Sequence, residues 1–271
     1  MKFPVIITLA CLPWSLVHGQ DAPPTPKDEK KSERVIHVLI AGQRAMPVFE
    51  KKGDEYIEVE PATKSIVPNA IELPDAPQLT EKSPTQKPDA KIMAWPNEVI
   101  HLGRCRCASS LRLRLIRTLA RQSHTPPELS CDLLDLKEPL VIISAEDGER
   151  GWDNPQARVI DLAGSTVPAR TVVALNLTRI PLVTRFESQQ GKLAPGTLQL
   201  LHLPPTAADV FRFRIDAQSN AGMVPVANSS YQIGTTERLL LLAIPNRQVA
   251  PGAPPLSLQM VIYQHMVTDK K

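Results

Sequence analysis

The stretch that decides the fold class is Val210-Phe211-Arg212-Phe213-Arg214-Ile215-Asp216, in which apolar and charged residues alternate. Successive side chains of a β-strand point to opposite faces, so the apolar residues share one face and the charged residues share the other. The pattern predicts a strand with one buried and one solvated face. Leu111-Arg112-Leu113-Arg114-Leu115 alternates in the same way, and we prefer a strand to a helix there because Arg112 would fall inside the apolar arc of a helix.

Short apolar runs recur along the chain with Gly and Pro between them. Proline accounts for 27 of the 271 residues, and an interior proline breaks a helix. The run Val35–Ile40 is short, apolar and β-branched, which is typical of a buried strand. We predict a mainly β protein with little helix: an immunoglobulin-like antiparallel β-sandwich, either one large sandwich or two packed together. Further runs that support this lie at 98–102, 111–116, 140–144, 158–162, 171–175, 197–203, 210–215, 238–244 and 256–263.

One pair of runs resembles a known family. Glu237–Pro245, followed by Leu256–Tyr263, resembles the strand pair of periplasmic pilus-type chaperones. The resemblance is confined to these two runs, so it implies immunoglobulin-like topology and assigns no functional residue.

Residues 1–19 have the pattern of a secretory signal peptide. Lys2 gives a basic start, residues 3–17 are mostly apolar, and Gly19 ends a cleavage-like triplet. The apolar run is shorter than the about 18–20 residues that span a membrane, although an uncleaved anchor is the alternative. We expect a mature chain that starts near Gln20, lies outside the cytoplasm as a secreted or periplasmic protein, and has no transmembrane span.

Composition divides the rest of the chain into four segments. We expect a charged, proline-containing disordered tether at 20–34, a small N-terminal β unit at 35–73, a proline-rich linker at 74–97 and the β-sandwich domain at 98–267. One short echo, between Ala45–Val48 and Gly222–Val226, is too brief to indicate duplicated domains.

Three cysteines, Cys105, Cys107 and Cys131, remain after removal of the signal peptide. Disulfides persist in the oxidising environment that an exported protein meets. Cys105 and Cys107 are two apart, and an extended strand holds such residues too far apart to bridge one another. We expect one disulfide from Cys131 to either Cys105 or Cys107. One thiol per chain would then remain, which thiol counting on the denatured, oxidised protein measures.

Six arginines lie between residues 104 and 121 with no acidic residue among them. Such a basic patch suits an anionic glycan, a lipid headgroup or an acidic protein. The alternative is a solvated strand face neutralised by carboxylates such as Asp132, Asp135 or Glu138. The formal net charge is +3 and no aromatic residues interleave, so we do not expect nucleic acid as a partner. The patch consists of Arg104, Arg106, Arg112, Arg114, Arg117 and Arg121.

The loop Glu146–Asn154 is acidic and contains glycine. Asp147, Glu149 and Asp153 are oxygen ligands of the type that calcium binds, but their spacing is not that of an EF-hand and we prefer a plain turn. The cysteines and nearby histidines are the alternative metal ligands, although paired Cys-x-x-Cys knuckles are missing. We therefore assign no metal and no cofactor.

The sequence contains no G-x-S-x-G, H-E-x-x-H, P-loop or G-x-G-x-x-G motif, so no catalytic residue is assigned. We expect a non-enzymatic binding or assembly protein of the cell envelope or exterior, which contacts a protein or envelope partner through sandwich edges and loops.

Two alternative functions remain open. The first is an exported hydrolase that uses Asp147, Glu149 and His101. It would show titratable residues with shifted pKa values in a concave pocket. The second is a glycan-binding adhesion module, which needs Trp95, Trp152 or the tyrosines exposed together.

Overall fold

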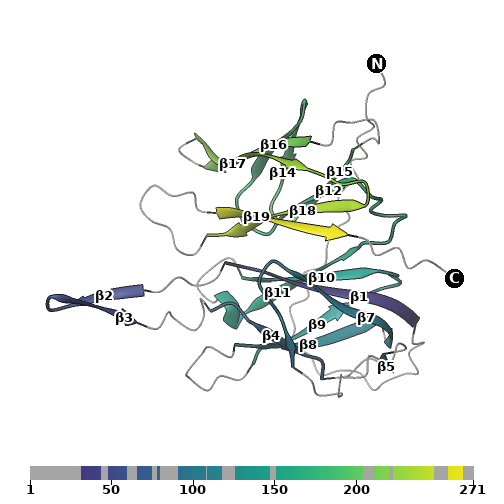
Figure 1. Ribbon diagram of the computed structural model, residues 1–271, viewed down its shortest axis with the longest axis horizontal. Helices are drawn as coiled ribbons and strands as arrows, with labels where there is room; N and C mark the ends of the chain where they lie inside the picture. The colour runs from purple at the N-terminus through teal and green to yellow at the C-terminus, as the bar shows by residue number, and fades with distance from the viewer. Residues whose placement is uncertain are drawn as a thin grey trace.

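The computed structural model describes residues 32–43, 48–59, 66–74, 78–79, 91–107, 109–117, 126–146, 151–203, 210–219, 222–246 and 256–264. Within these ranges the protein is mainly β, as the sequence predicts, and its one helical element is the 3-10 turn η2 (Gly151–Asp153). Four sheets stack face to face as two sandwiches (Figure 1). None of the described segments forms a helix long and apolar enough to cross a bilayer.

The first sandwich has an inner and an outer sheet. In spatial order, the first inner sheet consists of β11 (Pro155–Asp161), β10 (Pro139–Ala145), β1 (Ser32–Ala41), β7 (Val99–Cys107) and β5 (Gln78–Leu79). The first outer sheet consists of β6 (Ile92–Met93), β4 (Ala70–Glu72), β8 (Ser110–Ile116) and β9 (Glu128–Asp132). Strands from segments 35–73 and 98–161 therefore share sheets, and the proline-rich segment 74–97 contributes β5 and β6.

The second sandwich follows the connection 162–170. The second inner sheet consists of β15 (Leu198–His202), β12 (Thr171–Asn176), β18 (Glu237–Pro245) and β19 (Leu256–Gln264). The second outer sheet consists of β14 (Gln189–Leu193), β13 (Leu182–Phe186), β16 (Val210–Ser219) and β17 (Gly222–Gln232). A separate hairpin of β2 (Val48–Lys52) and β3 (Glu55–Val59) lies outside all four sheets.

The two sandwiches have the same topology. When β2, β3 and β5 are set aside, each sandwich contains eight described strands, which we count from first to eighth in chain order. In both inner sheets the first strand lies between the seventh and the fourth. In both outer sheets the second strand lies between the third and the fifth, and the sixth strand forms an edge. The fold is therefore a duplicated arrangement.

The strand order does not confirm the finer immunoglobulin-like expectation. In an immunoglobulin domain the first and second strands share a sheet, whereas here they belong to different sheets. The pairing is also not wholly antiparallel, because β1 pairs with β10 and β12 with β18 in parallel.

Three apolar layers hold the four sheets together. On β1, Ile36, Val38 and Ile40 face the first outer sheet, while Leu39 and Ala41 face the second sandwich. On β18, Leu239, Leu241 and Ala243 face the second outer sheet, while Leu240, Leu242 and Ile244 face the first sandwich. The inner strands read as continuous apolar runs because both of their faces are buried.

Candidate functional site

The β2–β3 hairpin presents apolar side chains to solvent. It extends beyond the two sandwiches (Figure 1), and every described side chain from Phe49 to Ile57 is exposed. Lys51 pairs with Tyr56 across the hairpin, which places Tyr56 on the same face as Phe49. Phe49 is 58% exposed and Tyr56 70%, so this face is an aromatic surface without cover from the described body of the protein.

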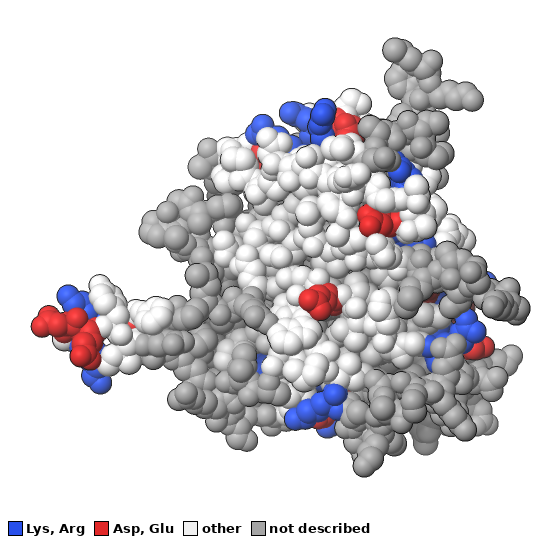
Figure 2. Space-filling view, in the orientation of Figure 1, with Lys and Arg blue, Asp and Glu red and all other residues white. Residues whose placement is uncertain are grey.

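Such a hairpin is suited to binding. A two-stranded hairpin alone is marginally stable in water, and exposed apolar surface on a soluble protein marks a contact site. Among the described strands, β2 and β3 pair with each other and with no other strand, so the outer edge of each is of the kind to which a partner strand can add. Figure 2 shows that the hairpin also carries charged side chains of both signs.

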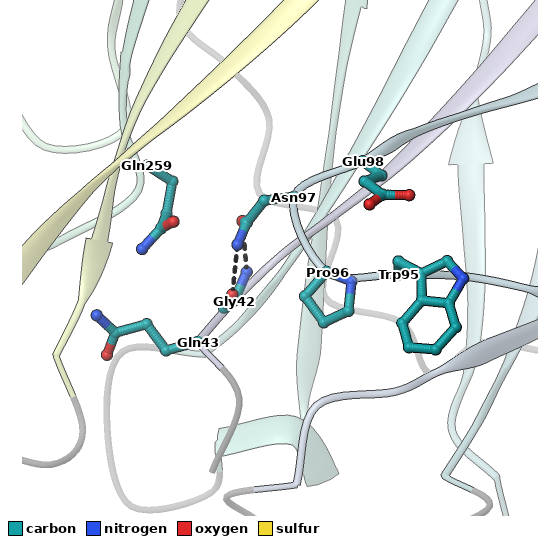
Figure 3. A pocket seen from close by; sticks show the side chains of 7 residues that line it. All are labelled: Gly42, Gln43, Trp95, Pro96, Asn97, Glu98 and Gln259. Carbon is teal, nitrogen blue, oxygen red and sulfur yellow. Dashed lines mark hydrogen bonds between the residues drawn. The ribbon is translucent and has the colours of Figure 1, made fainter. Parts of the chain in front are cut away.

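An open hollow of about 400 Å³ lies where the end of β1, the β6–β7 turn and β19 meet (Figure 3). Asn97 shapes it: its Nδ2 donates to the Gly42 carbonyl over 2.8 Å, and the Gly42 N–H donates to its Oδ1 over 3.3 Å. Asn97 has a φ of 64°, a conformation that asparagine tolerates better than most residues. The hollow is lined by Gly42, Gln43, Trp95, Pro96, Asn97, Glu98 and Gln259.

The lining of the hollow combines an aromatic ring with amides. Trp95 is 51% exposed at one side, and the amides of Gln43 and Gln259 lie at the other (Figure 3). Glu98 is the acidic residue of the lining. Indole rings stack on sugar faces, and amides and carboxylates bond sugar hydroxyls, so the chemistry of the hollow suits a glycan.

Titratable residues converge elsewhere, between the two inner sheets. His37 Nδ1 lies 2.9 Å from His101 Nδ1, and His37 Nε2 lies 3.1 Å from Tyr263 Oη and 3.4 Å from Glu138 Oε1. The Tyr263 hydroxyl donates to the Glu138 carboxylate. All these contacts are satisfied together when His101 donates from Nδ1 and His37 from Nε2. The cluster thus joins β1, β7 and the residue just before β10 in the first sandwich to β19 of the second.

Burial shifts the ionisation of this cluster. Partial burial lowers the pKa of His101, with a further contribution from His37, while Glu138 acts in the opposite direction. Burial, together with the hydrogen bond to Glu138, raises the pKa of Tyr263. Arg238 faces the Tyr263 ring at 5.5 Å from its centroid. The cluster thus lies in the seam between the sandwiches, where His37 and Tyr263 are buried and His101 is exposed.

The lowered pKa of His101 predicts weaker folding in mild acid. Its ordinary value is 6.5, so as the pH falls through this value the unfolded chain takes up the proton before the folded protein does. The free energy of unfolding should therefore decrease from about pH 7.5 to about pH 5.5. Thermal unfolding at the two pH values measures this.

His101→Asn is the matching control, because asparagine does not titrate. Its thermal midpoint should change less with pH than that of the unsubstituted protein. Equal pH dependence in both proteins would contradict the assignment to His101.

Carboxylates neutralise much of the predicted basic patch. Arg112 Nε donates to Glu128 over 2.9 Å, and Arg114 lies 3.5 Å from Glu72 and 3.6 Å from Glu128. Glu72 and Glu128 are not among the carboxylates that the sequence suggests, because pairing between neighbouring strands brings them to the arginines.

The other members of the patch are separated. Arg104 lies 3.7 Å from Glu33, and Arg117 donates to Asp153 over 2.8 Å. The Arg106 side chain and Arg121 lie outside the described residues. Of the calcium-or-turn candidates, Asp153 thus binds an arginine, while Asp147 and Glu149 also lie outside the described residues.

Cys131 lies on β9 and is buried in the first apolar layer. Burial raises the pKa of its thiol to about 12, so in the reduced form it is not reactive. The side chains of Cys105 and Cys107 lie outside the description, although their backbone belongs to β7. The predicted disulfide to Cys131 therefore stays a prediction.

Trp152 is not a sugar platform. It is 2% exposed and packs in the first apolar layer, where a Cβ on Gly42 would lie 2.8 Å from its ring. The polar, glycine-containing loop gives no sign that Trp152 is buried, but η2 turns the indole inward. Trp95 remains the exposed tryptophan of the described residues.

Sequence reasoning missed both open surfaces. The alternation at 56–60 predicts a strand with one buried face, whereas Ile57 is 43% exposed on the hairpin. The hollow joins residues that are distant in the sequence, so no local pattern indicates it. No protein-family model matches the chain, and no curated protein matches it either.

Proposed function

We propose that this is an exported, non-enzymatic binding protein of the cell envelope or exterior, and that the β2–β3 hairpin is its partner-binding element. The observation that carries the proposal is the exposed aromatic face formed by Phe49 and Tyr56 on a hairpin outside the four sheets. The pattern of residues 1–19 supports the location.

The position of the hairpin supports this function. The described part of the second sandwich has no counterpart of β2 and β3, so the hairpin is an addition to the strand order that the two sandwiches share. The four sheets pack through three apolar layers to which no described residue of the hairpin contributes, so the packing of the sheets does not depend on the hairpin. Aromatic side chains are the residues that most often anchor protein interfaces.

The test is quantitative affinity capture from the envelope fraction of the native host. Phe49→Ser/Tyr56→Ser should retain the partner roughly thirtyfold less well than the unsubstituted protein, because loss of an aromatic anchor has an effect of that order. Far-UV circular dichroism should not change, since both side chains are exposed.

Lys52→Ser/Glu55→Ser is the matched control on the same hairpin, because Lys52 pairs with Glu55 on the face opposite Phe49 and Tyr56. It removes one charge of each sign from exposed positions and should capture the partner as the unsubstituted protein does. Equal capture by the aromatic double variant would exclude the hairpin as the binding element.

A second candidate function, glycan binding, is favoured by the hollow beside Trp95. The ring and the amides of Gln43 and Gln259 line one open space (Figure 3). A glycan array probed with the mature protein tests this function. Trp95→Ala should abolish binding to the glycans that the unsubstituted protein binds. Unchanged binding would exclude the hollow as the glycan site.

A further inference from the structure

The two outer sheets carry arginines at equivalent positions. Strands β8 and β16 are the fifth strands of their sandwiches, and each pairs with the sixth. Arg112 lies opposite Ser130 on β9, and Arg212 lies opposite Ser230 on β17. The inward residues of both strands belong to apolar cores, so Arg112 and Arg212 both lie on outward faces.

The neighbours of the second arginine differ between the two sheets. Arg114 lies between Glu128 on β9 and Glu72 on β4. Its counterpart Arg214 lies between Asn228 on β17 and Arg185 on β13. The positions that Glu128 and Glu72 occupy in the first outer sheet are thus taken by Asn228 and Arg185 in the second.

The outward face of the second outer sheet is consequently cationic. Arg185, Arg212, Arg214 and Lys192 are all exposed there. Arg214 Nε bonds Asp216 at 2.9 Å, and Glu187 accepts the backbone N–H of Arg212 over 2.6 Å. Among the described residues, no carboxylate lies within ion-pair distance of the guanidinium of Arg185 or Arg212. Figure 2 shows Lys and Arg side chains at the top of the view, over β16, with acidic side chains beside them.

This arrangement concentrates positive charge on one face. Arg185 and Arg214 are directly paired across neighbouring strands, where like charges are unfavourable. Asp216 is the carboxylate that accepts from Arg214, while the Gln190 amide accepts from Arg185 over 3.4 Å. The polar residues around them bear amides and hydroxyls, namely Gln190, Asn228, Ser230 and Gln232, all exposed. Guanidinium groups bind carboxylate and sulfate through paired hydrogen bonds.

We propose that the outward face of the second outer sheet binds an anionic polysaccharide. The arginines would bind its carboxylate or sulfate groups, and the amides and hydroxyls would bond its sugar hydroxyls. A membrane-binding surface instead presents large apolar side chains that insert among lipids. This face is separate from the hairpin and from the hollow, so the inference does not depend on either.

The test measures binding of the mature protein to immobilised heparin, polygalacturonate and neutral dextran. The unsubstituted protein should bind at least one of the two anionic polysaccharides and not dextran, and salt should weaken the binding. Arg185→Ser/Arg212→Ser should weaken it about tenfold. Asn228→Glu, which restores the carboxylate position of the first outer sheet, should weaken it as well.

Arg112→Ser/Arg114→Ser is the matched control. It removes the same charge from the equivalent, neutralised face and should leave binding within about twofold. Thermal midpoints of all variants show that they are folded. Equal losses in the two arginine double variants would overturn the proposal, because net charge alone would then explain binding. The proposal would also be overturned if the protein bound neither anionic polysaccharide. This holds even if it bound vesicles of equal parts phosphatidylglycerol and phosphatidylcholine, which would indicate a lipid surface instead.

Discussion

Leu240→Asp is expected to destabilise the whole protein, by more than about 4 kcal/mol, because it places an unpaired carboxylate between the two inner sheets. Leu240 is fully buried on β18 and belongs to the apolar layer that the two sandwiches share. Urea unfolding followed by tryptophan fluorescence measures the change. Trp95 and Trp152 both lie in the first sandwich, so a shifted fluorescence transition shows that a substitution in the second sandwich reaches the first.

Ile262→Asp is the control for this prediction. Ile262 lies on the neighbouring strand β19, where it pairs with Leu239, but it is 46% exposed. Its substitution should change the free energy of unfolding by about 1 kcal/mol or less. If Leu240→Asp left the fluorescence transition unchanged, the two sandwiches would be energetically independent and the shared layer would be refuted.

Trp152→Ala should lower the free energy of unfolding by about 3–5 kcal/mol, the usual range for removing a large buried aromatic side chain. The indole is 2% exposed in the first apolar layer. Trp95→Ala, at a position that is 51% exposed, should cost about 1 kcal/mol or less. Chemical denaturation followed by circular dichroism compares the two variants.

Gly42 offers an independent check on the same contact. A Cβ at this position would lie 2.8 Å from the Trp152 ring, so Gly42→Ala should destabilise the unsubstituted protein. In the Trp152→Ala background the same substitution should cost less, because the shortest of its close contacts is gone and those to Val67, at 3.2 Å, remain. Strictly additive effects would contradict the packing of Trp152 against Gly42.

Local patterns predicted the strands that build the apolar layers. The alternation at 210–216 and the continuous apolar run at 238–244 both lie on strands, as expected. These strands could be predicted because the pattern of neighbouring residues in the sequence shows which of their faces are buried. Strands β13, β14 and β17 were not predicted. β17 is largely exposed and contains Pro225, so no buried stripe marks it.

The duplication was not predicted, for a different reason. The short echo between Ala45–Val48 and Gly222–Val226 falls in part on β2 and on β17, which are not equivalent strands. The true correspondence joins Leu111–Leu115 to Phe211–Ile215, where the arginines recur but every core residue differs. The two cores are packed with different side chains, so the equivalent strands keep the alternation of apolar and polar positions but not the same residues.

The candidate surfaces depended on tertiary structure. Gln43, Trp95 and Gln259 meet in one hollow only after β19 packs over β1 and β7. The basic patch was recognised as a run of arginines, but whether an arginine is neutralised depends on the strand beside it. Glu72 reaches Arg114 through pairing between β4 and β8, which no local pattern reveals.

The parallel pairs at the centre of the two inner sheets constrain how the chain folds as it is made. β1 needs β10, which ends at Ala145, and β12 needs β18, which ends at Pro245. Each closure spans a long loop, whose entropy is lost before the contact forms, and such non-local pairing slows folding. A ribosome must therefore deliver most of each sandwich before its inner sheet can be completed, and the emerging chain stays open during that interval.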